Sequence, residues 1–527
     1  MFGPRGWSKA QSRLWSYGCR RTYIPYNLRH SARWIPRNGV PGQARPWEVC
    51  AISEGKSKFE NLDVPRKKLH HHVLLLRPPG DHVPASKRVP AIARPFVSQR
   101  ALETLDLVEK FVEERCVPAD RVYAQQLGTS TQSRLAAHPA ILEDLKTEAR
   151  RLGLWNMFLP KAHYAEGAGF SNLEFGLMEE YLGKSVVASE ATNCAAPDTG
   201  NMEVLAKYGT EARKKQWLRP LLEGEIRSAF LMTEPNVASS DATNIQFSIR
   251  RDGDSYILDG QKWWSSGAPD PRCKLYILMG KSDPNNPSPY RQQTVVLVPS
   301  DAPRHHHHEN AFENVRVPAS NVVLGEGRGF EVIQGRLGPG RIHHAMRSIG
   351  NAERALEYFV ARITDPSKKP FGKQLSEHGV MLERVARSRV EIDAARLAVL
   401  NAAIIIDESN AKGALREISM VKIQTPQVVL DVADRAVQAF GAAGVCQDTP
   451  LPEIWTAGRA MRIVNGPDEV HLLQLGRNES KRGPLMLEKV ASQEQTAAAM
   501  LARYGLVPED SLQMNLVRSA ATRLARL

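Results

Sequence analysis

Apolar residues recur at helical spacing from residue 99 onward. In segment 102–118 they fall on one face of a helix, which Pro118 is expected to end. Segments 172–185 and 210–225 continue the helical pattern. Residues 99–229 are therefore predicted to form an N-terminal helical domain.

Near residue 244 the period changes to the two-residue alternation of a β-strand. Ile245 and Phe247 begin an alternation that breaks at Asp252-Gly253 and resumes at Leu258, which predicts a β-hairpin. Two more apolar runs of strand length follow. Residues 230–322 are therefore predicted to form a small β domain.

Helical spacing returns in residues 323–482. Between Met381 and Ile406 the apolar positions alternate four and three apart, and Leu397, Leu400 and Ile404 make the other face apolar as well. A helix that is apolar on several faces is buried on several sides, as in a bundle that also packs against other subunits. The predicted fold class is α+β, mainly α, in the order helical, β, helical, with residues 483–527 as a C-terminal extension.

The net charge of +13 is confined to one part of the 527-residue chain. Residues 1–100 hold 19 Lys and Arg against 5 Asp and Glu, and the remainder holds 51 against 52. A nucleic-acid enzyme would carry its basic surface on the folded part, so no nucleic-acid partner is expected. The longest apolar runs are far too short for a membrane span.

The two ends of the chain suggest different destinations. Residues 1–98 are predicted to be a basic leader and linker without regular structure. The leader resembles a mitochondrial presequence, although a leader without an address function fits equally well. The last three residues, Ala525-Arg526-Leu527, fit the small–basic–leucine pattern of a peroxisomal address. Peroxisome is the first expectation and mitochondrion the second.

Cysteines and histidines give no sign of a metal site. The six cysteines are scattered without a C-x-x-C pair, which indicates a reducing compartment and neither a disulfide framework nor a zinc site. The histidine clusters 70–72, 305–308 and 343–344 lack helical pairing with a carboxylate and are interpreted as solvated loop residues. No metal is expected.

Four stretches together resemble the acyl-CoA dehydrogenase family: "AFLMTEPNVASSD" (229–241), "DGQKWWSSGA" (259–268), the helix that opens with "GFEVIQGRLGPGR" (329–341), and "VNGPDEVH" (464–471). The resemblance spans about residues 100–480. The last motif is most similar to the subgroup of larger eukaryotic members and their fungal and bacterial relatives.

The resemblance implies an N-terminal helical domain, a β domain and a C-terminal four-helix bundle. It also implies FAD as cofactor and α,β-desaturation of an acyl-CoA thioester, in fatty-acid oxidation or in a specialised biosynthetic pathway. Family members carry a strand or two more than segment 300–321 provides, so the β domain is expected to be truncated. Implied partners are an acyl-CoA substrate, an electron acceptor (electron-transfer flavoprotein or oxygen) and further copies in a homodimer or homotetramer.

The resemblance implies that two groups of residues contact the flavin cofactor. One group lies in the β domain, and the other lies in the helical bundle of a neighbouring subunit. Ser240 is placed on the substrate side and Arg341 near the thioester, with a structural ion pair as the alternative for Arg341. The implied cofactor contacts are Met232 (backbone), Thr233 and Ser266 (hydroxyls), Trp264 (ring face), Lys368, Phe371 and Gln438 (adenine and pyrophosphate), and Glu469.

This chain differs from the family pattern at the position of the catalytic base. Where the closest subgroup has an aspartate this chain has Asn465, whose carboxamide cannot take a proton. The other family location for the base falls on Gly340. Asp468 is the nearest carboxylate, although a helix N-cap is the structural alternative for it. Three hypotheses stay open: low activity, a different chemistry, or deamidation of Asn465 in its Asn-Gly dipeptide to aspartate.

A catalytically silent flavin- or acyl-CoA-binding homologue is the rival hypothesis. A non-enzymatic membrane-surface anchor would need amphipathic spacing in the leader, which is absent.

Overall fold

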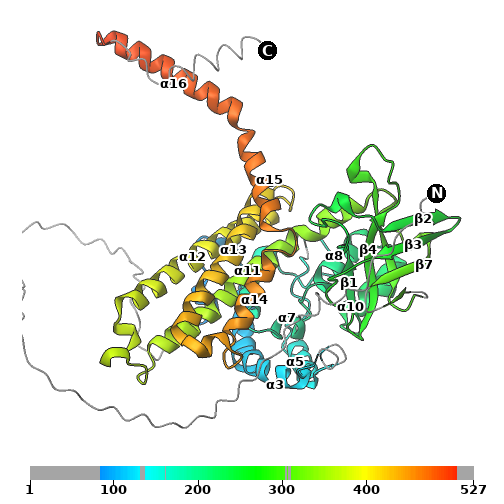
Figure 1. Ribbon diagram of the computed structural model, residues 1–527, viewed down its shortest axis with the longest axis horizontal. Helices are drawn as coiled ribbons and strands as arrows, with labels where there is room; N and C mark the ends of the chain where they lie inside the picture. Colours follow the sequence, from blue (N-terminus) through cyan, green and yellow to red (C-terminus); the bar gives the residue numbers. More distant parts are fainter. Residues whose placement is uncertain are drawn as a thin grey trace, which may run out of the picture. The chain divides into compact units, whose positions relative to one another are not determined.

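The computed structural model describes residues 83–506 except 131–133, 135–136, 161, 303–304 and 307–309. The basic leader up to residue 82 and the terminal tripeptide therefore lie outside the described residues. Within them, helices come first, a sheet follows, and a second set of helices closes the chain (Figure 1). None of the described helices combines the length and apolarity needed to cross a bilayer.

The N-terminal helices pack around one apolar core. In α6 the N-terminus is held by a capping box, in which Ser171 and Glu174 each accept a hydrogen bond from the other's backbone. The helices are α1 (Ala85–Arg88), α2 (Gln99–Phe111), α3 (Val117–Leu127), α5 (Ala140–Arg151), α6 (Asn172–Leu182), α7 (Ala188–Ala191), α8 (Asp198–Tyr208), α9 (Glu211–Arg213) and α10 (Arg219–Leu222).

The prediction that Pro118 ends the first helix is wrong. A five-residue π-helical turn, Val112–Cys116, joins α2 to α3, and the chain stays helical to Leu127. Pro118 follows this turn in the first positions of α3, where a missing N–H costs least. Pro220 follows a second such turn, Lys214–Leu218, at the start of α10.

The interpretation of the segment before residue 98 as linker is wrong for its described part. Ala85, Val89 and Ala93 are buried in the helical core. The carboxylate of Glu109 accepts a hydrogen bond from the backbone N–H of Ala85, and Asp106 accepts one from that of Ser86. Prolines limit the helices here to a few residues, so much of the order comes from contacts with α2.

The β domain is a seven-stranded sheet in the order β1-β4-β2-β3-β7-β6, with β5 paired to β4 (Figure 1, green). The predicted hairpin is confirmed as the antiparallel pair β2–β3, with Gly253 at φ +58° in its turn. The strands are β1 (Arg227–Leu231), β2 (Ser248–Asp252), β3 (Ser255–Gln261), β4 (Cys273–Lys281), β5 (Gln293–Pro299), β6 (His305–His306) and β7 (Ala311–Pro318).

The C-terminal helices form a bundle around α13, which contacts α11, α12, α14 and α15. The predicted apolar seam of α12 is buried along much of its length, from Ser388 to Ile406. Val390 and Leu397 remain exposed on the same helix. The helices are α11 (Gly329–Ile363), α12 (Gly379–Glu408), α13 (Leu415–Phe440), α14 (Leu451–Met461), α15 (Asp468–Ser480) and α16 (Gly483–Arg503).

Histidines 343 and 344 are not loop residues, contrary to the expectation. Both lie in α11, and His343 is buried with its ring edge-to-face against Phe175. Burial lowers the pKa of His343 to about 3, so its imidazole is neutral. His343 therefore belongs to the core between α11 and the N-terminal helices, and His344 follows it in the same helix.

Two glycines allow α6 and α11 to cross at close range. A β-carbon on Gly350 would lie 1.9 Å from the carbonyl oxygen of Glu180, and one on Gly183 would lie 2.3 Å from that of Arg347. Only a hydrogen side chain fits at either position. The crossing fixes the N-terminal helices against the helix that carries Arg341.

Candidate active site

Two loops at one end of the sheet are joined by backbone pairing. The backbone N–H of Trp263 donates to the carbonyl of Thr233 at 3.0 Å, and the Thr233 hydroxyl donates to the carbonyl of Trp263 at 2.7 Å. Thr233 follows β1 and Trp263 follows β3. The sheet thus brings together "MTEP" and "KWWSS", which are 30 residues apart.

A buried ion pair lies beneath these loops. The ammonium of Lys262 donates to the carboxylate of Glu234 and to the carbonyl of Met232, at 2.8 Å each. Glu234 also accepts hydrogen bonds from the backbone N–H groups of Gln246 and Phe247. Burial lowers the pKa of Lys262 to about 8, against the opposing effect of Glu234. The pair therefore rigidifies the backbone that presents Thr233.

Trp264 projects from this rigid base. Its side chain is 84% exposed and its φ is +50°, in the left-handed region that a bulky residue rarely adopts. Ser266 is exposed two residues further on, and Ser240 is exposed in the loop after β1. An exposed indole held in a strained backbone beside hydroxyls is the arrangement expected of one wall of a binding site for a flat ring.

Helix α11 connects this region to the Asn465 turn. The guanidinium of Arg336 lies 4.2 Å from the ring centroid of Phe230 in β1, and its Nε donates to the side-chain oxygen of Asn201 at 3.0 Å. Gly340 lies one turn further along the same face of α11. A β-carbon on Gly340 would meet no atom within 4 Å, so the space beside it is open.

The Asn465 turn is held by its backbone carbonyl. That oxygen lies 3.3 Å from Nε of Arg341, which donates to it, and 3.3 Å from Nε2 of His471. Asn465 has a φ of +57° and Gly466 one of +97°. Arg341 is buried and has no carboxylate within ion-pair distance among the described residues, so the structural ion pair considered for it is not found.

The N-cap interpretation of Asp468 is wrong. Pro467 occupies the N-cap position of α15, and Asp468 is its first helical residue. The carboxylate of Asp468 accepts a 2.5 Å hydrogen bond from Nε of Arg462, while its other oxygen is buried without a partner. Glu469 points to the surface. Asp468 is therefore committed to an ion pair that anchors the turn.

The surroundings of the turn are rich in positive charge. Lys422 of α13 is buried and its ammonium donates to the carbonyl of Met461. Burial lowers the pKa of Lys422 to about 8 and that of Arg341 to about 10. It also lowers the pKa of His471 to about 4, with Arg341 and Lys422 acting in the same direction, so the imidazole is neutral. Among the described residues, the turn is thus surrounded by the cations Arg341, Lys422 and Arg462 and by one carboxylate, that of Asp468, which is already paired with Arg462.

A buried carboxylate lies near Arg336. Both oxygens of Glu203 in α8 lack hydrogen-bond partners in the described part of the chain. Burial raises the pKa of Glu203 to about 8, although Arg336 and Lys207 oppose this effect. Glu203 is therefore largely protonated at neutral pH.

The remaining predicted cofactor contacts lie elsewhere in the bundle. Phe371 is 97% exposed with a φ of +55°, in the loop between α11 and α12. Gln438 is exposed near the end of α13, and Arg362 links the two regions by donating to the carbonyl of Ala439. Lys368 lies in the same loop, half-buried.

The predicted cofactor contacts at the sheet and those in the bundle lie far apart within one chain. Helix α11 has 35 residues, so its ends are roughly 50 Å apart. Its beginning contacts β5 in the sheet, and the loop with Lys368 and Phe371 follows its other end. Within one chain the structure therefore groups Met232, Thr233, Trp264 and Ser266, and separately Lys368, Phe371 and Gln438.

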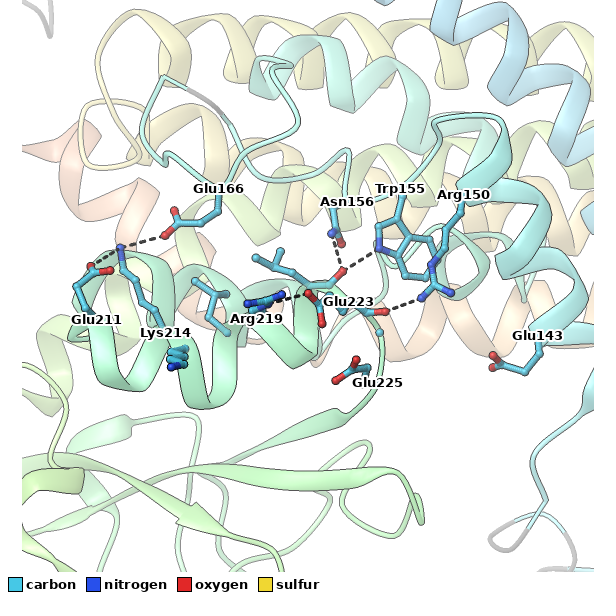
Figure 2. A pocket seen from close by; sticks show the side chains of 14 residues that line it. Glu143, Arg150, Trp155, Asn156, Glu166, Glu211, Lys214, Arg219, Glu223 and Glu225 are labelled. Carbon is cyan, nitrogen blue, oxygen red and sulfur yellow. Dashed lines mark hydrogen bonds and ion pairs between the residues drawn. The ribbon is translucent and has the colours of Figure 1, made fainter.

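A surface pocket between α5 and α10 shares no residue with either set (Figure 2). Some of its glutamates pair with its basic residues, as Glu166 does with Lys214 and Glu223 with Arg219. The indole N–H of Trp155 donates to the backbone carbonyl of Leu222. The charges of the pocket therefore largely cancel, and they do not single out a ligand.

Sequence reasoning missed four of these residues: Lys262, His471, Arg336 and Glu203. Lys262 and His471 lie inside the quoted motifs, yet only the tertiary structure reveals their partners. A lysine at the end of a strand and a histidine inside a helix are ordinary surface residues in a sequence. What marks these two residues is their burial, and burial depends on segments that are distant in the sequence.

Comparison with known proteins agrees with this architecture. Three family models match in succession: the acyl-CoA dehydrogenase N-terminal domain at residues 98–225, the middle domain at 229–324 and the C-terminal domain at 327–479. The solved structure of a Mycobacterium abscessus protein assigned to the acyl-CoA dehydrogenases superposes with a TM-score of 0.67 at 42% identity, covering 73% of this chain and 99% of that one.

Two curated relatives differ in how much of them the chain covers. Acyl-CoA dehydrogenase family member 10 of Mus musculus is 48% identical over 72% of this chain, which spans only 37% of that relative. FadE2 of Mycobacterium tuberculosis, named a probable acyl-CoA dehydrogenase, is 47% identical over 73% of this chain and 97% of its own length. With three domain models matched in order and 97% of a bacterial relative covered, the chain belongs to the acyl-CoA dehydrogenase family.

Proposed function

We propose that this protein is an FAD-dependent acyl-CoA dehydrogenase that introduces an α,β double bond into an acyl-CoA thioester. The observation that carries the proposal is that α11 links the two regions. Its Arg336 lies against Phe230 of β1, the strand that leads to Thr233, and its Arg341 donates to the Asn465 turn, with the open space at Gly340 between these two arginines. The exposed Trp264 ring lies at the sheet end of this arrangement, beside the Thr233 and Ser266 hydroxyls.

The residues at the sheet end fit a flavin. The exposed indole of Trp264 offers a flat apolar face of the size of a ring system. The Thr233 hydroxyl has its proton engaged by the carbonyl of Trp263, so it offers lone pairs, whereas the Ser266 hydroxyl can donate. The buried pair of Lys262 and Glu234 keeps these groups in place without contributing its own charge to the surface. When bound, FAD accepts the β-hydride of the substrate.

The removal of the α-proton is the step for which this chain lacks the expected residue. Desaturation needs a base on the side of the acyl chain opposite the flavin, in a site closed to water. Neither the Asn465 carboxamide nor Gly340 can take a proton, and Asp468 is held by Arg462. Arg341 would favour an enolate-like charge at the thioester, because it is buried without an anionic partner.

A silent binder is the second candidate function, and Asn465 is the observation that favours it. In that case the chain would hold FAD and an acyl-CoA without turnover. Purified protein, titrated anaerobically with acyl-CoAs of different chain lengths, separates the two. Yellow protein that bleaches supports the dehydrogenase, yellow protein that does not bleach supports the silent binder, and colourless protein overturns both.

We also propose that the flavin site is shared between two copies of this chain, in a homodimer or homotetramer. Lys368, Phe371 and Gln438 lie too far along the bundle to reach the Trp264 wall of their own chain. The exposed apolar residues of α12, Val390 and Leu397, offer a surface for a second copy. The expected result of analytical ultracentrifugation is a dimer or tetramer, and a monomer that binds FAD fully contradicts this.

The pathway and compartment are proposals as well. We place the enzyme in the peroxisome by its Ala525-Arg526-Leu527 ending, with the mitochondrion as the alternative, and in fatty-acid oxidation or a specialised biosynthetic pathway. In the peroxisome the electron acceptor would be oxygen or another acceptor, and in the mitochondrion it would be electron-transfer flavoprotein. A fluorescent fusion placed ahead of the chain, compared with one lacking the last three residues, tests the address.

A further inference from the structure

Asn465 and Gly466 form a peptide group with unusual surroundings. The carbonyl oxygen of this group accepts from Nε of Arg341 and lies at the same distance, 3.3 Å, from Nε2 of His471. The nitrogen of the same group belongs to Gly466. Two polar hydrogens on a carbonyl withdraw electron density from the amide and make its N–H more acidic.

We propose that the Asn465–Gly466 link is a self-deamidating site, at which Arg341 and His471 polarise the peptide group and the chain converts its own asparagine into the missing aspartate. The Gly466 nitrogen is the nucleophile and the Asn465 side-chain carbon is its target. That the resulting carboxylate serves as the catalytic base rests on the proposed function, whereas the conversion itself does not.

The reaction balances with water as the only co-reactant. The Gly466 nitrogen loses its proton and bonds to the side-chain carbonyl carbon of Asn465, and ammonia leaves with the former side-chain nitrogen. The five-membered imide that remains takes up one water, which opens the ring. When water attacks the side-chain carbonyl carbon, the bond from that carbon to the Gly466 nitrogen breaks, the normal peptide bond remains, and residue 465 becomes aspartate. When water attacks the backbone carbonyl carbon, the backbone C–N bond breaks instead and the product is isoaspartate.

The nucleophile is free to react. The Gly466 N–H and the Asn465 carboxamide make no hydrogen bond to any residue that the structure describes. Glycine adds no side chain at the attacking residue, and its φ of +97° is open to few other residues. A β-carbon there would also crowd the imidazole, at 3.0 Å from Nε2 of His471.

The charges around the turn favour both the reaction and its product. Arg341 from α11, Lys422 from α13 and Arg462 before α15 are cationic. Among the described residues, Asp468 is the one carboxylate linked to them, through Arg462. His471 is neutral, so its ring can donate one proton and accept another. Positive charge stabilises the amide anion that attacks, and a carboxylate at residue 465 would supply the anionic partner that buried Arg341 lacks.

The test is a mass measurement on the full-length chain and needs neither cofactor nor substrate. Trypsin releases residues 463–477, which contain the site, and Asn38-Gly39 in the leader is a second Asn-Gly link in the same sample. The protein is aged at neutral pH in heavy-oxygen water and digested at acid pH. Conversion during ageing then appears as peptide 463–477 carrying one labelled oxygen, and a protease that cleaves before aspartate but not isoaspartate identifies the product.

We expect residue 465 to convert faster than Asn38 in the native chain, and the ratio of the two rates to fall about tenfold in denaturant, where the polarising contacts are lost. The variant His471→Leu should lower the ratio in the same direction, and Gly466→Ala should abolish conversion while Asn38 continues. An unmodified Asn465 beside a converted Asn38, or a ratio that rises on denaturation, overturns the proposal. If conversion occurs but the converted protein does not bleach with acyl-CoA, the proposed function fails and the self-deamidation stands.

Discussion

The guanidinium of Arg341 donates a hydrogen bond to the backbone carbonyl of Asn465, with 3.3 Å between Nε and the oxygen. The two residues are 124 positions apart, one in α11 and the other in the turn before α15. The contact places a buried cation, which has no carboxylate partner among the described residues, beside a residue that carries an amide where the family resemblance implies a carboxylate. Whether this chain can catalyse the reaction therefore depends on whether residue 465, next to Arg341, carries an amide or a carboxylate.

Replacing Asn465 with aspartate should speed the anaerobic bleaching of the flavin by acyl-CoA. A positioned general base contributes on the order of 100-fold or more, and the new carboxylate would lie on the turn whose backbone carbonyl Arg341 contacts. Stopped-flow absorbance measures the rate, with freshly prepared wild-type protein as reference. Asn478→Asp adds the same charge at the exposed end of α15 and should leave the rate unchanged. Equal rates in N465D and wild type would show that residue 465 does not limit the reaction.

Replacing Lys262 with methionine should change how stability depends on pH. The folded pKa of Lys262, about 8, lies below its ordinary value of 10.5, so the unfolded chain binds more protons between these values and the wild type gains stability as pH rises through that window. The gain is on the order of 3 kcal/mol and should be absent from the variant. Urea unfolding at a series of pH values gives both curves. Because Lys422 titrates in the same range in both proteins, the difference between them isolates Lys262.

Replacing Glu203 with glutamine should produce the opposite trend. The folded pKa of Glu203 is raised from 4.5 to about 8, so the folded chain holds a proton that the unfolded chain has lost, and wild-type stability falls as pH rises through this window. The loss is a few kcal/mol, and E203Q should not show it. Thermal unfolding at pH values across that window compares the two proteins. A variant that loses as much stability as the wild type would mean that Glu203 is charged in the folded state.

Mixing two defective variants should restore activity if flavin sites are shared. Trp264→Ala removes the ring wall, and Phe371→Ala removes an exposed contact at the other end of α11. Each variant alone should lose bound FAD. A mixed oligomer would contain one site with both defects and one with neither, so unfolding and refolding the two together should recover yellow, bleachable protein. Recovery that does not exceed the sum of the separate variants would place all cofactor contacts on one chain.

What local pattern determines was predictable from the sequence. The alternation around Asp252-Gly253 specifies the β2–β3 hairpin, because strand period and turn residues act over a few positions. The seam of α12 follows from its own spacing. The order of the motifs identified the family, and Asn465 could be recognised as unable to act as a base from its chemistry alone.

What depends on contacts between distant segments was decided only by the tertiary structure. Segment 83–98 is ordered by α2, and a π-helical turn carries the chain through Pro118. Asp468 pairs with Arg462 instead of capping its helix. The contacts of Arg341 and His471 with one carbonyl join residues from different helices, and the free energy of burial that makes His471 neutral exists only once those helices have packed.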